Sequence, residues 1–452
     1  MLLGALLLAA AGFVISSPVP WDLWWSAPRD ALRLAQGENP HPVRLVVPGD
    51  PPLSAVALLG VRLFHDPSLS GSGRMSCASC HDPALAYGPA GSLSVVMGGP
   101  QVSTPGFRAV PSLRYLYRQP AFTIGPDVEN GNDVPVPLTQ QAQAATGQAR
   151  ELKTALTPQA AATNLVPEGG LFWDGRADTL EQQINGPLYN PAEMDGGTMR
   201  QVAHKLASGP YAAQLQQLFG AGLLENPGMT VDEAMFAIGR YEIEDPSFHP
   251  FTSKYDAWLE GRARLTRAEL AGYFLFNDPA KGNCAACHLD QPASDGAPPL
   301  FTDHQFEALG APRNPAIPAN RDPNYHDLGI CGPYRTDMRT STQYCGMFLT
   351  PTLRNVALRR VFFHNGVFRS LTQVLDFYVN RDTHPERFYP RDATGHVMRY
   401  NDIPPQYRDN VDTVDAPFNR HPGDQPALTP TEIQDVIAFL DTLTDGYTRS
   451  PH

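Results

Sequence analysis

The sequence has no surplus of positive charge. Its 34 lysines and arginines are outnumbered by 46 aspartates and glutamates, which gives a formal net charge of -12. A chain of this sign does not attract the phosphate backbone of a nucleic acid or an anionic lipid surface. After residue 19, no stretch is apolar enough to span a bilayer. Long runs with the alternating pattern of a strand are also missing, which favours a mainly α fold.

Cysteine is scarce, and four of the six cysteines fall in two copies of one motif. The copies are Cys77-Ala78-Ser79-Cys80-His81 and Cys284-Ala285-Ala286-Cys287-His288. Two thiols one helical turn apart can each form a thioether with a haem vinyl group, which leaves the next imidazole to bind the iron. A pair of zinc or redox Cys-x-x-Cys motifs is the alternative, but zinc sites do not require that histidine. The motifs predict two covalently bound c-type haems, with His81 and His288 as proximal iron ligands.

The other two cysteines and the N-terminus favour an exported protein. Outside the bacterial cytoplasm, where such cytochromes mature, Cys331 and Cys345 would form a disulfide; two free thiols are the alternative. Residues 2–19 are apolar and uncharged, and tryptophans suited to a membrane interface follow them. This stretch lacks the positive charge and the clear cleavage site of a typical signal peptide. We expect a periplasmic protein in which residues 1–25 are a signal peptide or a membrane anchor.

Apolar spacing and capping residues outline the domains. Helices are predicted at residues 179–186, 199–206, 231–242, 266–276, 371–378 and 433–443, and a further helix ends at residues 60–64. Each haem motif then lies in its own half of the chain. We expect two tandem cytochrome c-like domains with long loops, residues 26–250 and residues 251–452, that meet near residues 245–260.

Several further motifs, in order, resemble those of one family. They are Leu63-Phe64-His65-Asp66-Pro67-Ser68-Leu69-Ser70-Gly71-Ser72-Gly73, Phe172-Trp173-Asp174-Gly175-Arg176, Asn190-Pro191-Ala192-Glu193-Met194, Thr350-Pro351-Thr352-Leu353-Arg354-Asn355, and Phe363-His364-Asn365-Gly366. Over about residues 55–445, this order resembles the bacterial di-haem cytochrome c peroxidases and their MauG relatives. Relative to that pattern, residues 116–163 are an insertion, and residues 140–156 within it are predicted to be helical.

The resemblance implies that the first haem, on His81, reacts with peroxide. It places Glu193 on the open face of that haem, where a carboxylate can move a proton between the two peroxide oxygens; a carboxylate that merely ends a helix is the alternative. Gln183 is implied to orient groups in the same pocket. Trp173 is a candidate for a path between the haems, together with Tyr273, Phe274 and Phe276.

The second haem, on His288, is implied to store electrons. Fourteen residues after the histidine of the Phe-His-x-Gly motif, relatives carry its other axial ligand, which is Met in the plain peroxidases and Tyr in MauG relatives. Here that position is Tyr378, and a core tyrosine is the alternative. A phenolate lowers the reduction potential and stabilises high oxidation states, so we expect oxidation to be shared by both haems. His364 is implied to support this site through a hydrogen bond.

The resemblance fails at the positions that build the family's inter-haem calcium site. Its asparagine is replaced by Ala109, and its threonine and proline by Arg359 and Val361. These changes make calcium doubtful. Arg359 or Arg360 is a candidate for the missing positive charge, and a solvated surface pair is the alternative.

These features predict a periplasmic di-haem c-type peroxidase that reduces hydrogen peroxide to water. One alternative is a MauG-like enzyme that oxidises a side chain of a partner protein, and another is a non-catalytic electron-transfer cytochrome. No histidine lies between His81 and His204, so the mobile histidine that blocks the peroxidatic haem in many relatives has no equivalent here. The acidic charge suits an electron-donor protein with a basic surface, such as a cytochrome or a cupredoxin.

Overall fold

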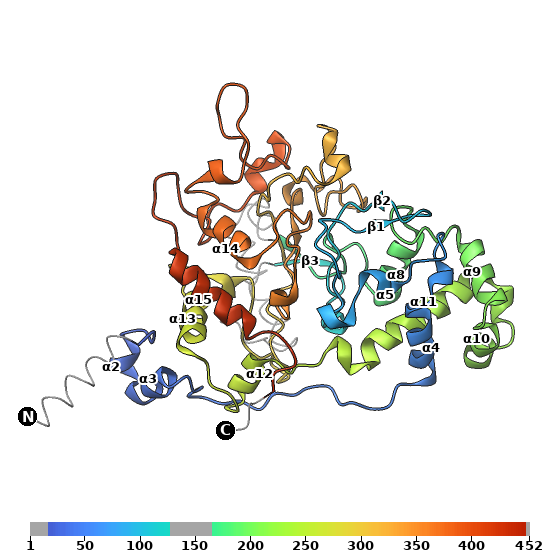
Figure 1. The fold of residues 1–452 in the computed structure, drawn as a ribbon, viewed down its shortest axis with the longest axis horizontal. Helices are drawn as coiled ribbons and strands as arrows, with labels where there is room; N and C mark the ends of the chain where they lie inside the picture. Colours follow the sequence, from blue (N-terminus) through green and yellow to red (C-terminus); the bar gives the residue numbers. More distant parts are fainter. Residues whose placement is uncertain (1–16, 127–164, 449–452) are drawn as a thin grey trace, which may run out of the picture.

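The computed structural model describes residues 17–126 and 165–448. The helix predicted at residues 140–156 and the first 16 residues lie outside these ranges. Within them, no helix has both the length and the apolar character that a membrane crossing needs. Helices form two groups joined by long loops, and strands are few (Figure 1).

The first helix group is built around the long helix α11. Its members are α4 (Ala55–Phe64), α8 (Leu180–Tyr189), α9 (Met199–Ser208), α10 (Ala212–Phe219) and α11 (Pro227–Glu244). Helix α4 crosses α11 at Gly60, where an added Cβ atom would lie 1.9 Å from the carbonyl oxygen of Ala237. Only glycine permits so close an approach of two backbones. The crossing buries a core of leucines, valines and aromatic residues between these helices.

The second helix group repeats this arrangement. It contains α12 (Lys254–Leu259), α13 (Arg267–Asn277), α14 (Leu371–Asn380) and α15 (Pro430–Asp441). Helix α13 crosses α15 at Gly272, where a Cβ atom would lie 1.9 Å from the carbonyl oxygen of Asp435. In each group, the helix that precedes a Cys-x-x-Cys-His motif therefore packs on the last helix of its half through a glycine.

The N-terminal helices α2 (Leu23–Ser26) and α3 (Pro28–Ala35) pack against the second group. The backbone N–H of Leu265 donates to the carbonyl of Gly37 at 2.9 Å, and that of Val43 donates to Leu259 at 2.9 Å. The chain then runs along one edge of the molecule to α4 in the first group (Figure 1). The start of the described chain thus contributes to the core of the C-terminal half.

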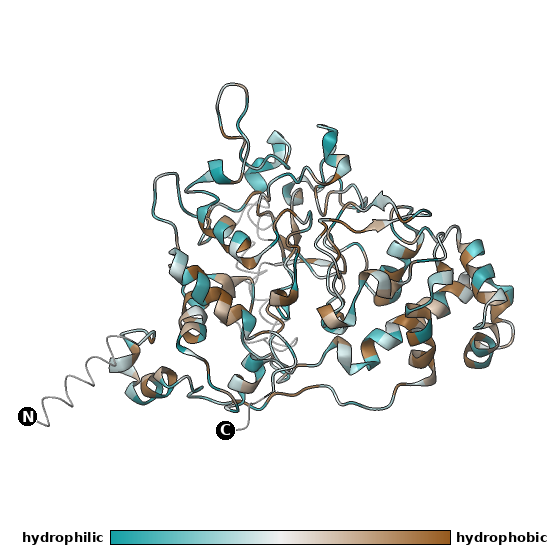
Figure 2. Cartoon of the chain, viewed as in Figure 1, coloured by the Kyte–Doolittle hydropathy of each residue, from teal (hydrophilic) through white to brown (hydrophobic). Residues whose placement is uncertain are grey.

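All helices predicted within the described ranges are present, with ends shifted by a few residues. Capping boxes begin several of them, such as Thr198 with Gln201 and Thr266 with Glu269. Polar and apolar residues alternate around these helices, as expected when one face lies in a core (Figure 2).

The described strands form three short antiparallel pairs. They are β1 (Met97–Gly98) with β2 (Thr104–Pro105), β3 (Thr123–Pro126) with β4 (Leu165–Glu168), and β5 (Phe306–Glu307) with β6 (Phe348–Leu349). Strands of two to four residues leave no alternating pattern long enough to read in the sequence.

A buried ion pair fixes α12 to the loop that precedes α14. The guanidinium of Arg354 donates to both carboxylate oxygens of Asp256, at 2.6 and 2.9 Å, and the two side chains are 0% and 2% exposed. Burial opposes ionisation of Asp256, but the charge and hydrogen bonds of Arg354 lower its pKa overall. The pair therefore stays ionised, and it links two segments about 100 residues apart.

We expect Asp256→Asn to destabilise the haem-loaded protein by about 3–5 kcal/mol, because it leaves a buried guanidinium without its counter-charge. Chemical unfolding measures this loss. Since the folded pKa of Asp256 lies below its ordinary value, the wild-type contribution is present near neutral pH and is lost as the pH falls through that lowered pKa. The control is Glu260→Gln, which breaks an ion pair with the exposed Arg262 and should cost less than about 1 kcal/mol. Equal small losses in both variants would contradict the prediction.

Candidate active site

A cavity of about 560 Å³ lies between the two halves of the chain. Residues distant in sequence line it, among them Trp173, Gln183, Cys284, His288, Arg359 and Tyr378. Its size is within the usual range for sites that hold cofactors and other small molecules. The fold thus brings predicted site residues from both halves around one space.

The second motif lies in the cavity wall. Residues Cys284–Ala286 form a turn of 3-10 helix, and Cys284, Cys287 and His288 all line the cavity. The ring Nδ1 of His288 donates to the carbonyl oxygen of Phe301 at 2.9 Å. Because a carbonyl only accepts, this bond puts the proton on Nδ1 and leaves the lone pair on Nε2. Burial lowers the pKa of His288 to about 4, so the ring is neutral and suited to bind a metal.

The first motif has the same local design. Helix α5 (Cys77–Cys80) begins with a capping box between Ser76 and Ser79. The ring Nδ1 of His81 donates to the carbonyl oxygen of Tyr87 at 2.8 Å, and burial lowers its pKa to about 4. Both histidines are therefore neutral and held by a backbone carbonyl, as iron-binding histidines require.

The zinc alternative finds no support in the donor set. Within the described chain, no group of three or more His, Cys, Asp or Glu side chains is placed to hold a metal ion. Each motif offers two free thiols and one neutral imidazole beside apolar side chains. These residues fit a c-type haem, which needs two thioether bonds and one axial nitrogen.

Tyr378 lies on α14 and lines the same cavity as His288. Its ring packs 5.2 Å from that of Phe418 and 6.1 Å from that of Phe363, between ring centroids. Burial raises its pKa, so the free phenol is neutral. Tyr378 and His288 therefore lie in the wall of one cavity.

Glu193 lies in the loop after α8 and is held from two sides. The side-chain amide of Asn190 donates to Glu193 Oε1 at 2.8 Å, and the backbone N–H of Gly99 donates to its carbonyl at 2.7 Å. Burial raises the pKa of Glu193, although the charges of Arg176 and Arg108 oppose the shift. Burial and, after it, the charge of Glu193 raise the pKa of the Cys80 thiol to about 11, so this carboxylate lies near the first motif.

Three other predicted residues line the cavity. Gln183 is buried on α8, and the indole N–H of Trp173 donates to the carbonyl of Ala109 at 2.8 Å. The ring of His364 stacks on Phe348 with centroids 3.5 Å apart, and its Nε2 is buried without a hydrogen-bond partner in the described chain. Such an unpaired nitrogen in a cavity wall fits a polar group of a bound molecule.

Some of the predicted site residues do not line the cavity. Among the aromatic candidates, Trp173 and Phe276 line it, whereas Tyr273 and Phe274 pack against the core of the second helix group. Cys77, Cys80, His81 and Glu193 are not part of its described lining, but the segment after the first motif reaches it through Leu85 and Ala86.

Sequence reasoning missed a buried arginine cluster beside this cavity. Arg108 donates to Asp174 at 2.7 Å and to both carboxylate oxygens of Asp327 at 2.6 and 2.7 Å, and Arg176 donates to Asp174 at 2.8 Å. Asp174 and Arg176 belong to a motif shared with the family, and Arg108 directly precedes Ala109 at the calcium position, so the sequence could have indicated that these three residues matter. Asp327 lies in a loop outside every recognised motif, and nothing in the sequence points to it.

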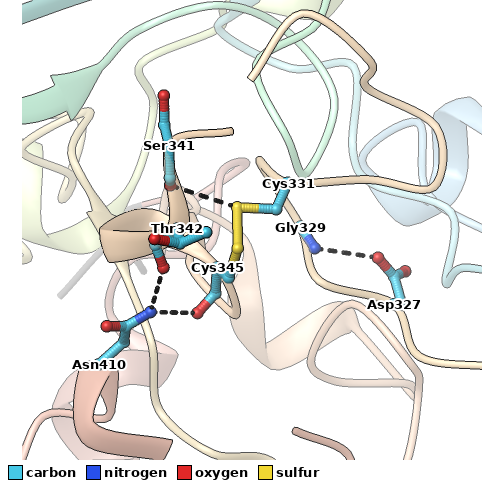
Figure 3. The surroundings of a disulfide bond; sticks show 7 residues. All are labelled: Asp327, Gly329, Cys331, Ser341, Thr342, Cys345 and Asn410. Carbon is cyan, nitrogen blue, oxygen red and sulfur yellow. Dashed lines mark hydrogen bonds between the residues drawn. A yellow bond between two sulfur atoms is a disulfide. The ribbon is translucent and has the colours of Figure 1, made fainter. Parts of the chain in front are cut away.

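A disulfide closes the loop that follows Asp327. Cys331 and Cys345 are bonded, with Cα atoms 5.0 Å apart. Figure 3 shows this bond beside Asp327, which accepts the backbone N–H of Gly329 at 3.1 Å, and Asn410, which donates to the carbonyl of Cys345 at 3.0 Å. The bridge thus lies next to a carboxylate of the arginine cluster.

Two neutral histidines, each in a Cys-x-x-Cys-His motif, and a cavity between the two halves are the features of a haem-binding protein of the di-haem type. The family model for the di-haem cytochrome c peroxidases matches residues 54–264. The chain is 31% identical over 410 residues to the methylamine utilization protein MauG of Paracoccus denitrificans (strain Pd 1222), covering 86% of this chain and 89% of that protein. It therefore belongs to the di-haem cytochrome c peroxidase and MauG family and is an enzyme.

Two further relatives are similar over most of the chain. The cytochrome c551 peroxidase of Nitrosomonas europaea is 28% identical, with 76% of this chain and 77% of that protein covered. The crystal structure of the diheme peroxidase BthA from Burkholderia thailandensis E264 is 35% identical, with a TM-score of 0.73 and 89% of each chain covered. A structure of a BthA variant with a tyrosine replaced by methionine has the same TM-score.

Proposed function

We propose that this protein is a di-haem c-type peroxidase that reduces hydrogen peroxide to water. The observation that carries the proposal is Glu193, a carboxylate with a raised pKa, anchored by Asn190 near the first motif. An electron-transfer cytochrome has no use for a proton carrier beside an open iron. Its relatives named as peroxidases support the same reaction.

The cofactor assignment follows from the motifs. We propose that Cys77 and Cys80 bind one haem covalently and that Cys284 and Cys287 bind the other, with His81 and His288 as axial ligands. When bound, the haems supply iron that delivers electrons to peroxide. We divide the chain into a signal peptide or anchor (residues 1–25) and haem domains at residues 26–250 and residues 251–452, with the N-terminal helices packed on the second domain.

Glu193 supplies the proton chemistry. Reduction of hydrogen peroxide takes up two protons and two electrons and releases two waters, and one proton must reach the oxygen that leaves. The Asn190 amide occupies Oε1 of Glu193, which leaves Oε2 to take a proton from one peroxide oxygen and return it to the other. Gln183 then serves to orient the bound peroxide, and Trp173 lines the same cavity as Gln183 and the second motif.

We propose that Tyr378 is the second axial ligand of the haem on His288. Its position in the family register, its enclosure and its place in the same cavity as His288 support this assignment. The BthA variant in which a tyrosine becomes methionine is a precedent for exchanging these two residue types in a relative. Tyrosine ligation would share oxidation between both haems, as in the MauG-like branch.

A second function is favoured by the similarity to MauG itself. The chain covers 89% of that methylamine utilization protein at 31% identity. In this alternative, the same site oxidises a side chain of a partner protein instead of accepting electrons from a donor such as a cytochrome or a cupredoxin. Peroxide consumption driven by a reduced donor protein, without change in that donor's mass, distinguishes peroxide reduction from protein modification.

We expect the fully oxidised enzyme to react with peroxide without prior reduction, because no histidine is available to block the His81 haem. Stopped-flow absorbance after one equivalent of peroxide measures the rate, and a half-reduced sample is the comparison. A reaction seen only after reduction would show that another residue, such as Met97, blocks the site.

Glu193→Gln should slow the reaction with peroxide by roughly 10²- to 10⁴-fold, while both haems remain attached. Only the deprotonated carboxylate accepts a proton, and burial raises the pKa of Glu193, so the wild-type rate should fall as the pH is lowered through that pKa. This acidic limb should vanish in the variant. The matched control is the exposed Glu225→Gln, which should keep the wild-type rate and profile.

Tyr378→Met should raise the reduction potential of the second haem, because a thioether stabilises the ferrous state and a phenolate stabilises the ferric state. Potentiometric titration of both haems measures the shift. Tyr407→Met, which changes a partly buried tyrosine on the core of the second helix group, controls for altered packing. If both variants have the wild-type potential, Tyr378 is a core residue and the MauG-like assignment is wrong.

A further inference from the structure

The residues at the family's calcium positions do not suit a calcium ion. Calcium binds six to eight oxygen atoms, most of them from carboxylates and carbonyls. Ala109 has no side-chain oxygen, and its carbonyl already accepts the indole N–H of Trp173 at 2.8 Å. Val361 is buried and apolar, and Arg359 adds a positive charge that repels a cation. The side chains at these positions thus offer calcium no oxygen ligand, which leaves only the backbone carbonyls of Arg359 and Val361.

Neighbouring carboxylates do not make up for this loss. Asp174 and Asp327 lie close to Ala109 in the fold, but both are ion-paired with Arg108 and nearly inaccessible, with side chains 0% and 8% exposed. In the described ranges, no three acidic, histidine or cysteine side chains converge on a possible metal position. The surroundings of the family's calcium position are therefore cationic here.

Arg359 itself lines the cavity between the two halves. Its Nη2 donates to the carbonyl oxygen of Val110 at 3.0 Å. A Cβ atom added to Gly88 would lie 3.7 Å from Arg359 Nη1, so the guanidinium lies beside the segment that holds the His81 ring. Arg359 thus stands between the first motif and the cavity that holds the second.

The charge of Arg359 has no carboxylate partner in the described chain. Desolvation lowers its pKa to about 10, so it remains a cation at neutral pH. The other arginines of the cavity wall differ, because Arg114 pairs with Asp445 and Arg354 pairs with Asp256. A half-buried cation in a cavity wall without a counter-charge is suited to pair with an anion.

We propose that the guanidinium of Arg359 takes the place of the family's inter-haem calcium ion and pairs with a haem propionate. A guanidinium presents a planar set of N–H donors that matches a carboxylate, and the haems that the motifs would attach carry carboxylates as propionates. The positive charge is then part of the polypeptide and no chelator can remove it. This inference rests on the two-haem assignment of the proposed function.

The first test measures calcium in the holoenzyme. We expect elemental analysis after dialysis against EGTA to find far less than one calcium ion per chain. The visible spectrum and the potentials of both haems should be the same before and after dialysis and after addition of calcium chloride. One tightly held calcium ion per chain, or potentials that change on chelation, would overturn the proposal.

The second test removes the charge. Arg359→Gln should lower the potential of the first haem, because loss of a nearby cation favours the ferric state, and that potential should become pH-dependent once the unpaired propionate titrates. Arg359→Lys, which keeps the charge, should stay close to wild type. The control is Arg360→Gln, because Arg360 is the adjacent arginine and is exposed. The same potentials in Arg359→Gln and Arg360→Gln would overturn the proposal.

If Arg359→Gln fails to retain haem, the lysine variant decides. Normal haem content and potentials in Arg359→Lys support a role for the charge, whereas loss of haem there too shows that the side chain serves packing and overturns the proposal. None of these measurements uses peroxide turnover. A failure of the proposed peroxidase activity therefore leaves this inference intact, and the reverse also holds.

Discussion

The architecture of the cavity depends on one cation, Arg108, whose side chain is only 10% exposed. Its guanidinium bridges Asp174 and Asp327, and so joins three segments that lie far apart in the sequence. Both carboxylates are almost inaccessible, and breaking such a pair leaves a buried charge that costs several kcal/mol. Through Asp174 the cluster positions the neighbouring Trp173, whose indole N–H is bound by the carbonyl of Ala109 next to Arg108. The cavity wall and the ion cluster are therefore one unit.

The two halves position their Cys-x-x-Cys-His motifs in the same way. Each motif follows a helix that packs on a second helix through a glycine, Gly60 in one half and Gly272 in the other. Each motif histidine donates Nδ1–H to a backbone carbonyl, which leaves the lone pair on Nε2. The two motifs are thus alike locally and differ in their surroundings, because Glu193 lies near the first and Tyr378 lines the cavity with the second.

The cavity wall carries charges of both signs. The chain is acidic overall, with a net charge of -12, and the wall contains Arg114, Arg354 and Arg359 together with Asp327 and other carboxylates. Two of these arginines are neutralised by aspartates from other segments. The net acidic charge suits an electron donor with a basic surface.

The sequence alone determined what local chemistry demands. The spacing of the two motifs, the capping boxes such as Thr266 with Glu269, and the helix on which Tyr378 lies can be read in order along the chain, because each depends on residues within a few positions of one another. The order of the family's motifs along the chain identified Glu193 and Gln183 as candidate site residues. Their roles as catalytic residues remain predictions.

Only the tertiary structure decided the contacts between distant segments. Asp327 lies 219 residues from Arg108 in a loop without periodicity, so no local pattern could pair them. The sequence offered Arg359 and Arg360 equally, and the fold placed one in the cavity wall and the other in solvent. The N-terminal helices joined the C-terminal core for the same reason. Burial and charge pairing between remote segments follow from packing the whole chain, and neither composition nor spacing records them.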